Sequence, residues 1–454
     1  MKNYLSHVCW LVGGVVAGLL ALHFLPTIPW GDTSLRRVDL LADIRPKTAP
    51  ASALPPDTFL LPPIEKPVFV DTCKAGLTCI EDYADSTRRG MDTFYAALDR
   101  CTREQGSVRI AYFGDSFIEA DIFTADLRSL LQSRYGGCGV GFVPITSPIS
   151  GFRPTLRHSF NGWESHLTTD SAHFDPSLQG IAHSYFRARE GATIEIKGQS
   201  RYALHLDTFE VATLYFHTTD TLLLQATINK TDNRHLTATG APGLQVWTVD
   251  GHIGRIAWQV EQTDSALFYG VALDGRHGIS LDNFSVRGST GLSLCGIPRS
   301  TLQAFNRLRP YDLIVLQYGL NVANARQTNY DAYRKGMEET VEYLKACFPQ
   351  AGILLVGIGD RDARTETGEV ATMPCVTSLI RYQQAVAANT HIAFWNLFTA
   401  MGGPESMARL VHATPAMANH DYTHINFLGG KHLADLLYQT LCYGKEQYDR
   451  RHAH

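Results

Sequence analysis

Residues 108–116 read Val-Arg-Ile-Ala-Tyr-Phe-Gly-Asp-Ser, and they carry the clearest signal of the fold class. Its first six residues, Val108–Phe113, predict a short and mostly apolar strand. A helical pattern follows, in which apolar residues from Phe123 to Leu131 share one face. A strand that leads into an amphipathic helix is typical of a βα unit in a parallel sheet.

The same alternation returns in the C-terminal third of the chain. Strands are predicted at 285–287, 313–317, 353–356 and 392–395. Helices are predicted at 301–308, 330–347, 376–389 and 428–441. Apolar strands that alternate with amphipathic helices predict a parallel sheet covered by helices on both faces.

Between residues 159 and 280 this alternation stops. Short runs rich in β-branched and aromatic residues follow one another, separated by turns such as Asp250-Gly251. We expect strands at 192–196, 202–206, 211–216, 222–228, 244–249, 255–260 and 266–273. Seven short strands without helices predict a β-sandwich of about 120 residues. Because βα units lie on both sides, residues 159–280 are interpreted as an insertion into an α/β domain formed by residues 68–158 and 281–454.

The region before this body has two parts. Residues 4–25 contain no Asp, Glu, Lys or Arg, and about 22 such residues are enough to cross a hydrocarbon core of roughly 30 Å as a helix. We expect residues 1–25 to be a membrane anchor; the alternative is a cleaved signal peptide, although no clear small-x-small cleavage site ends the run. Residues 26–67 hold nine of the chain's 20 prolines and predict an extended linker. Both interpretations predict export.

Composition excludes several classes of protein. The 454 residues include 40 Lys plus Arg against 44 Asp plus Glu, and a net charge of -4 has the wrong sign for a nucleic-acid-binding protein. The content of 44% hydrophobic and 19% charged residues is typical of a globular chain. Nine cysteines are too few for a disulfide scaffold of this size. Cys73 and Cys79 are close enough to form a small disulfide loop, and the sequence leaves open whether they do.

Ser116 is the first candidate catalytic residue. It directly follows the first predicted strand and should therefore lie at the carboxyl edge of the sheet, where ligands bind in open α/β folds. We expect Ser116 to open a helix whose N-terminus offers N–H groups to a developing oxyanion. The alternative is that Ser116 only caps that helix.

A nucleophilic serine needs a base, and His424 is the best placed histidine. Residues 421–424 read Asp-Tyr-Thr-His, just before the last predicted helix. This spacing lets the Asp421 carboxylate accept a hydrogen bond from one imidazole nitrogen, while the other remains free to deprotonate a hydroxyl. A zinc site with His412 and His420 is the alternative, but their spacing matches no familiar ligand set.

Two further residues follow predicted strands. Gly288 lies in residues 286–291, Val-Arg-Gly-Ser-Thr-Gly, and Asn321 ends residues 318–321, Tyr-Gly-Leu-Asn. The Gly288 N–H and the Asn321 amide could donate to one oxyanion at the sheet edge. Both could equally be ordinary turn residues, because glycine and asparagine favour turns.

Together these four blocks resemble the SGNH, or GDSL-type, hydrolase superfamily, which is named for this order of Ser, Gly, Asn and His. The resemblance implies an α/β, flavodoxin-like, three-layer hydrolase domain that covers most of the chain. It also implies that Ser116 is the nucleophile, His424 the base and Asp421 the residue that orients it. The oxyanion hole would then consist of Ser116, Gly288 and Asn321.

The resemblance can be narrowed to the bacterial peptidoglycan O-acetylesterases. Residues 114–121, 135–142 and 401–407 carry it, reading Gly-Asp-Ser-Phe-Ile-Glu-Ala-Asp, Tyr-Gly-Gly-Cys-Gly-Val-Gly-Phe and Met-Gly-Gly-Pro-Glu-Ser-Met. That group has a β-rich, carbohydrate-binding-like module between its serine and glycine blocks, which matches residues 159–280. The asparagine block here reads Gly-Leu-Asn rather than Gly-Thr-Asn or Gly-x-Asn-Asp, so contacts to the acyl group are expected to differ.

This resemblance implies an exported serine esterase that removes O-acetyl groups from peptidoglycan or a related cell-wall glycan. It would act at the periplasmic face of the inner membrane and would need no cofactor or metal. One alternative is an O-acetyltransferase that modifies a cell-wall glycan or exopolysaccharide together with a membrane acyltransferase. Another is a non-catalytic glycan-binding protein, in which Trp247, Trp258, Tyr202 and Tyr215 would stack on sugars, although strand aromatics are more commonly core residues.

Overall fold

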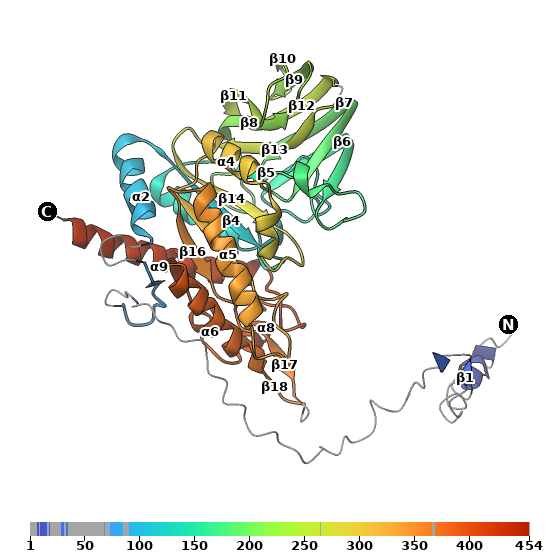
Figure 1. Ribbon diagram of the computed structural model, residues 1–454, viewed down its shortest axis with the longest axis vertical. Helices are drawn as coiled ribbons and strands as arrows, with labels where there is room; N and C mark the ends of the chain where they lie inside the picture. The colour runs from blue at the N-terminus through green and yellow to red at the C-terminus, as the bar shows by residue number, and fades with distance from the viewer. Residues whose placement is uncertain are drawn as a thin grey trace. The chain divides into compact units, whose positions relative to one another are not determined.

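The computed structural model describes residues 73–84, 90–263, 265–365 and 368–453, together with a few short pieces before residue 73 (Figure 1). The chain divides into two compact units, residues 1–59 and 60–454. In the first unit, β1 (Pro29–Trp30) pairs antiparallel with β2 (Thr33–Ser34). The expected anchor at 1–25 and linker at 26–67 fall largely outside the described residues. None of the helices described is long and apolar enough to span a bilayer.

Six strands form the central sheet of the second unit, in the order β14-β4-β15-β16-β19-β3. Their bounds are β14 (Gly278–Ser285), β4 (Ser107–Gly114), β15 (Leu313–Gln317), β16 (Gly352–Val356), β19 (Ala393–Trp395) and β3 (Glu81–Asp82). Only β3 is antiparallel to its neighbour. Counted along the chain, the five parallel strands have the order 2-1-3-4-5, which is the flavodoxin-like order predicted by the resemblance.

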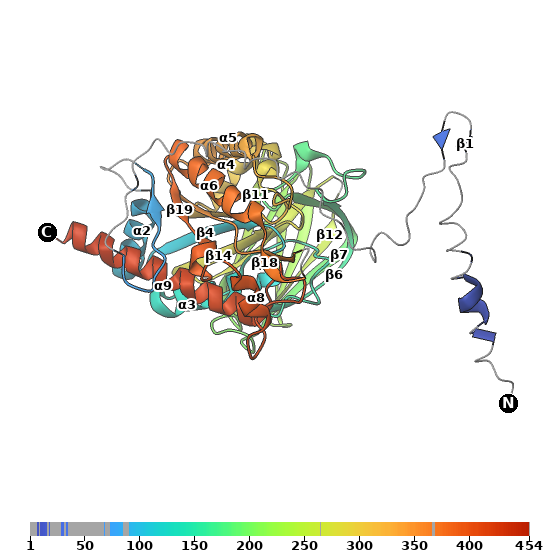
Figure 2. The same cartoon turned by 90° about the horizontal axis from the view of Figure 1, so that it is seen from below.

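Helices cover both faces of this sheet, as Figure 2 shows. One layer holds α2 (Asp92–Glu104), α3 (Thr124–Tyr135) and α9 (Phe427–His452), and the other holds α4 (Arg299–Leu308), α5 (Asp331–Cys347) and α6 (Pro374–Asn389). Every residue of β15 and β16 is buried, as expected for parallel strands covered on both faces. The predicted helices agree with α4, α5, α6 and the start of α9, while α2 was not predicted.

Short elements follow the last strands of the sheet. They are α7 (Leu397–Ala400), α8 (Ser406–Val411) and the hairpin of β17 (Asp362–Arg364) and β18 (Val370–Thr372). The strand predicted at 285–287 proves to be the end of the longer β14. Residues 278–280, expected in the insertion, therefore belong to the central sheet.

The inserted region is a nine-stranded antiparallel sheet. Its strands are β5 (Gly141–Val143), β6 (Leu156–Leu167), β7 (Ser184–Gly198), β8 (Phe209–His217), β9 (Leu222–Ile228), β10 (Asp232–Ala238), β11 (Gln245–Ile253), β12 (Arg255–Gln262) and β13 (Leu267–Asp274). The strand predicted at 202–206 is absent, because these residues form turns in which His205 has a φ of 65°.

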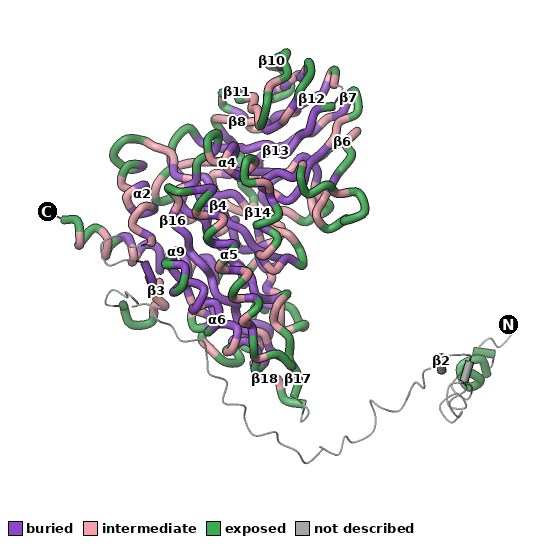
Figure 3. Tube along the Cα trace, viewed as in Figure 1, coloured by how far each residue is buried: buried purple, intermediate pink, exposed green. Residues whose placement is uncertain are grey.

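The prediction of a β-sandwich is corrected by the hydrogen bonding of these strands. They form one continuous sheet that branches at β7 and β13, rather than two separate sheets. β7 is 15 residues long and pairs with β6, β12 and β13. The sheet has a largely separate apolar core, and Figure 3 shows buried residues along both the insertion and the central sheet.

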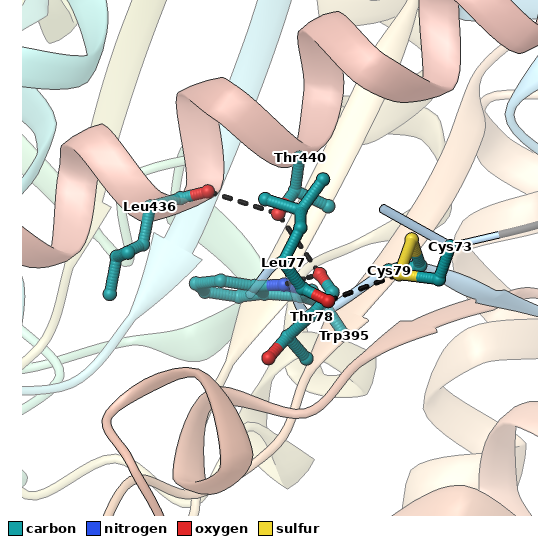
Figure 4. The surroundings of a disulfide bond; sticks show 7 residues. All are labelled: Cys73, Leu77, Thr78, Cys79, Trp395, Leu436 and Thr440. Atoms are coloured by element: carbon teal, nitrogen blue, oxygen red, sulfur yellow. Dashed lines mark hydrogen bonds between the residues drawn. A yellow bond between two sulfur atoms is a disulfide. The ribbon is translucent and has the colours of Figure 1, made fainter. Parts of the chain in front are cut away.

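Cys73 and Cys79 form the disulfide that their spacing allowed, with Cα atoms 5.9 Å apart (Figure 4). The Thr78 carbonyl in this loop accepts hydrogen bonds from Trp395 Nε1 and Thr440 Oγ1, each at 3.0 Å. Trp395 ends β19 and Thr440 lies in α9, so the disulfide loop is fastened to the edge of the central sheet. In the described part of the chain, six other cysteines, at 101, 138, 295, 347, 375 and 442, are free thiols.

Candidate active site

The candidate residues gather where the central strands end. Val286 N–H donates to Gly114 O at 2.9 Å, which is the last hydrogen bond between β4 and the chain that leaves β14. Ser116 and Gly288 each lie two residues beyond this bond on neighbouring parallel strands. Asn321 follows β15, which pairs with β4 on its other side. The carboxyl edge of the sheet therefore brings the three blocks together, as their spacing predicted.

The expectation that Ser116 opens a helix is wrong. Residues 119–121 form a short 3₁₀ turn, and α3 begins only at Thr124. Ala120 and Asp121 have φ values of 56° and 63°, which interrupt any continuous helix. The fully buried Asp121 carboxylate is held in this position by hydrogen bonds from Thr124, Arg128 and Thr155. The N–H groups near Ser116 therefore belong to a turn rather than to the end of a long helix.

Ser116, His424 and Asp421 form a hydrogen-bonded chain. Ser116 Oγ lies 3.2 Å from His424 Nε2, and His424 Nδ1 lies 2.8 Å from Asp421 Oδ2. Asp421 Oδ1 accepts the backbone N–H groups of Thr423 and His424, both at 3.0 Å. Because an ionised carboxylate only accepts, Nδ1 carries the hydrogen and Nε2 is left to accept from the serine hydroxyl. This is the geometry of a serine, histidine and aspartate triad.

Asp421 is held in its ionised form. Partial burial acts to raise the pKa of the Asp421 carboxyl. Hydrogen bonds from the His424 backbone, the His424 imidazole and the Thr423 backbone lower it by more, so the pKa of Asp421 lies below its usual value. The side chains of His424 and Asp421 are 41% and 49% exposed, so the base is open to solvent and to substrates. An ionised Asp421 can therefore stabilise the imidazolium that forms when His424 takes a proton.

Asn321 connects the serine and glycine blocks. Its Nδ2 donates to Ser289 O at 2.9 Å and to Asp115 Oδ2 at 3.1 Å. Asp115 is buried, and its other oxygen accepts the Phe117 N–H at 2.9 Å. Burial raises the pKa of Asp115 to about 6, against the opposing effect of the Phe117 N–H. Both hydrogens of the Asn321 side-chain amide are thus used in hydrogen bonds, one to Ser289 O and one to Asp115 Oδ2. To donate to an oxyanion, the amide must break one of these hydrogen bonds or share its hydrogen between two acceptors.

Gly288 lies in a turn that only glycine adopts without strain, with a φ of 80°. The preceding residue, Arg287, forms an ion pair with Glu119, which lies three residues after Ser116. This exposed ion pair connects the segment that contains Gly288 to the turn that contains Ser116. The oxyanion-hole roles of Ser116, Gly288 and Asn321 remain predictions.

Sequence reasoning missed Arg361, which connects the asparagine and histidine blocks. Arg361 Nη1 donates to Leu320 O at 3.1 Å and to Ala323 O at 3.2 Å, on either side of Asn321. The N–H of the next residue, Asp362, donates to Tyr422 O in the triad loop at 3.1 Å. The one available signal was position, because this segment follows β16 at the same edge of the sheet.

No metal centre is evident in the part of the chain that the structure describes. Within it, no group of three or more His, Cys, Asp and Glu side chains is arranged to hold a metal ion. His412, from the alternative zinc site, instead places Nε2 3.3 Å from the hydroxyl of Tyr422.

We expect Asn321→Ala to lower kcat for a small activated acetyl ester by about 10²–10³-fold, because the variant lacks one predicted donor to the oxyanion. The measurement is the steady-state hydrolysis of p-nitrophenyl acetate. Asn324→Ala, three residues away, is the matched control and should hydrolyse at the wild-type rate. A wild-type rate in Asn321→Ala would contradict the role of this amide in the oxyanion hole.

Comparison with known proteins supports the fold. Neither a protein-family model nor a curated protein sequence matches the chain. Among solved structures, a peptidoglycan O-acetylesterase matches with a TM-score of 0.67 and 19% identity, covering 81% of this chain and 99% of that chain. A family two carbohydrate esterase from Cellvibrio japonicus has a TM-score of 0.26 and 8% identity, covering 64% and 99%. A GDSL-like lipase from Parabacteroides merdae has a TM-score of 0.28 and 14% identity, covering 36% and 73%. The first match confirms the predicted resemblance at the level of the fold.

Proposed function

We propose that the chain is an exported serine esterase that removes O-acetyl groups from peptidoglycan or a related cell-wall glycan. The observation that carries this proposal is the hydrogen-bonded chain of Ser116, His424 and Asp421 at the carboxyl edge of the sheet. The fold shared with a peptidoglycan O-acetylesterase supports an acetylated glycan as the substrate.

The reaction follows from the geometry of the three side chains. Ser116 Oγ attacks the acetyl carbonyl while His424 Nε2 accepts its proton. The N–H groups of Ser116 and Gly288 and the Asn321 amide stabilise the tetrahedral oxyanion. His424 then protonates the departing sugar hydroxyl, which leaves an acetylated Ser116. Water that has lost a proton to His424 hydrolyses this intermediate and releases acetate.

Export is part of the same proposal. We assign residues 1–25 as a membrane anchor or a cleaved signal peptide, and residues 26–67 as a linker to the periplasmic domain. The Cys73–Cys79 disulfide supports an oxidising compartment, because such bonds are rare where thiols are kept reduced.

The test is acetate release from O-acetylated peptidoglycan by the full-length protein, beside its Ser116→Ala variant. We expect release that depends on Ser116. Hydrolysis of p-nitrophenyl acetate without release from peptidoglycan would retain the triad and reject this substrate. Absence of both activities in a folded protein would reject the esterase.

Transfer of the acetyl group to a glycan hydroxyl is the alternative reaction, in which a membrane acyltransferase supplies the acetyl group. It is favoured by the exposure of His424, since an alcohol can approach the acyl-enzyme as water does. Addition of a non-acetylated glycan to the p-nitrophenyl acetate assay distinguishes the two reactions. Acetylated glycan as the main product would favour the transferase, and free acetate would favour the esterase.

A purely glycan-binding function has less support. Trp258 and Tyr215 are buried, and Trp247 packs against Trp258 with ring centroids 4.9 Å apart. Tyr202 donates its hydroxyl hydrogen to Asp126 of α3. These aromatics therefore serve the core and the domain junction, as expected for most strand aromatics.

A further inference from the structure

A cavity of about 490 Å³ lies beside the serine turn, between the central sheet and the inserted domain. Glu119 and Arg287 line it from the hydrolase side, and Arg153 and His158 line it from the insertion side. Glu119 comes three residues after Ser116, and Arg287 directly precedes Gly288. The cavity therefore begins next to the proposed nucleophile and is large enough for a sugar residue.

Arg153 is a largely buried cation whose guanidinium group is not fully hydrogen-bonded. Its side chain is 11% exposed, with Nε 2.9 Å and Nη2 2.8 Å from Asp121 Oδ2. Asp121 is also paired with the fully buried Arg128, so two guanidinium groups share one carboxylate. Asp282, another nearby carboxylate, is already bound by Arg309. Within the described part of the chain, Arg153 Nη2 is buried without a hydrogen bond, although it lies 2.8 Å from Asp121 Oδ2 as an ion pair. This corner of the cavity therefore offers a positive charge and an N–H donor to a ligand.

His158 supplies a neutral acceptor to the same cavity. Its Nε2 lies 3.0 Å from the Ile145 carbonyl, so Nε2 carries the hydrogen. Burial lowers the pKa of His158 to about 4. The Ile145 carbonyl opposes this effect, and the positive charge of Arg153 adds to it. The imidazole is therefore neutral near pH 7, and Nδ1 can accept a hydrogen bond from a hydroxyl or amide N–H.

His183 adds a second acceptor. Gln179 Nε2 donates to the carbonyls of Pro176 and Gly296, which turns Gln179 Oε1 toward His183 Nδ1 at 3.2 Å. Nδ1 therefore carries the hydrogen, and Nε2 is an acceptor. His183 lines the cavity, is 3% exposed, and its Nε2 has no partner within the described part of the chain. A buried imidazole acceptor without a partner is expected to have a polar ligand.

Phe152 is an exposed aromatic residue that is close in sequence to residues lining the cavity. It is 76% exposed and lies between Ser150 and Arg153, both of which line the cavity. An exposed aromatic face beside hydrogen-bonding groups can cover the apolar face of a sugar ring while the hydroxyls reach polar partners.

We propose that this cavity binds an acidic sugar of the glycan, with the Arg153 guanidinium donating to its carboxylate. His158 and His183 accept from its hydroxyl or amide groups, and Phe152 covers one face of its ring. This inference rests on the proposed function and deepens it by specifying the substrate. The substrate is a glycan in which the acetylated sugar carries a free carboxylate or is next to a sugar that does. Two sources share this chemistry: the lactyl group of muramic acid without its peptide, and a uronic acid.

The test is titration calorimetry with the full-length Ser116→Ala protein, which cannot hydrolyse a bound ester. The probes are a peptide-free muramic-acid disaccharide, a digalacturonate and neutral chitobiose. We expect one acidic probe to bind about 10–100-fold more tightly than chitobiose, the range of a hydrogen bond between charged groups. Arg153→Met in the same background should remove this preference. Equal binding of all three probes, or an unchanged preference in the variant, would overturn the proposal.

Two further variants keep the test decisive if Arg153→Met does not fold. Ser150→Glu introduces a negative charge at the lining of the cavity and should weaken the acidic probes alone. Phe152→Ala, at an exposed position, should weaken all three probes about equally. If neither change alters binding, the cavity is not the site.

Turnover separates this inference from the proposed function. Arg153→Met should slow acetate release from an acidic acetylated glycan by a larger factor than it slows hydrolysis of p-nitrophenyl acetate. An acidic probe could bind in a way that depends on Arg153, while no acetate release from glycan depends on Ser116. That result would support the binding site and reject the esterase. The rate of acetate release from glycan could instead be independent of Arg153 and of a carboxylate on the glycan. That result would support the esterase and contradict the proposed binding site for an acidic sugar.

Discussion

Ser116→Ala is expected to lower kcat for p-nitrophenyl acetate by about 10⁶-fold, the size of effect seen when a serine nucleophile is removed from a triad. In the proposed reaction its Oγ is the atom that attacks, and His424 Nε2 lies 3.2 Å from it. His424→Ala should cause a loss of similar size, because no other base then accepts the proton. The double variant should be no slower than either single variant, because the two side chains act as a unit.

Controls for this prediction replace residues of the same types outside the triad. His412→Ala removes a histidine that contacts Tyr422 in the triad loop, and it should hydrolyse at close to the wild-type rate. Ser133→Ala removes a serine of α3 that contacts His205 instead of the triad, and it too should be active. Thermal unfolding of each variant shows whether it is folded. If folded Ser116→Ala kept a tenth of the wild-type rate, another group would have to be the nucleophile.

Asp421→Asn completes this series and should lower kcat by about 10⁴-fold. The amide keeps the shape of the side chain, but it removes the charge and can present a donor to His424 Nδ1. The imidazole would then carry its hydrogen on the wrong nitrogen.

The sequence predicts which residues lie together at the sheet edge because its signals are local. Asp421 and His424 are three residues apart, and Ser116, Gly288 and Asn321 each follow a strand. A parallel sheet brings such residues to one edge without any further information. The contact between Ser116 and His424 spans 308 positions and is predicted only through the fold. In contrast, Arg153 and Arg361 act through distant partners, and no local pattern marks them.

The errors have the same physical origin. Alternation of apolar residues shows which side chains face a core, but it does not show which strands hydrogen-bond, so the continuous sheet of the insertion was predicted as a sandwich. β6 was missed because only two of its 12 residues are buried. The helix expected at Ser116 fails because the Asp121 carboxylate binds Arg128, Arg153 and Asn283, the last of which lies 162 positions away.

Arg309→Met is expected to lower the free energy of unfolding by about 3–5 kcal/mol, the usual effect of removing one partner from a buried ion pair. The Arg309 side chain is 2% exposed and donates to Asp274 at 2.6 and 2.9 Å and to Asp282 at 2.6 and 2.8 Å. Asp274 ends β13 of the insertion, and Asp282 lies in β14 of the central sheet. The arginine therefore joins the two domains, and its loss leaves two buried carboxylates without their shared cation.

The pH dependence of this deficit identifies its cause. Burial alone would raise the pKa of Asp274, but Arg309 holds it below its usual value. A carboxyl with a lower pKa in the folded state stabilises the fold above its unfolded pKa of about 4, and this contribution is lost as the pH falls. In urea unfolding, the deficit of Arg309→Met should therefore be largest near pH 7 and should shrink below about pH 4. Arg307→Met, at an exposed position in the last turn of α4, two residues before Arg309, should change the free energy of unfolding by less than about 0.5 kcal/mol. A deficit that stays constant from pH 7 down to about pH 2.5 would assign the loss to packing rather than to charge.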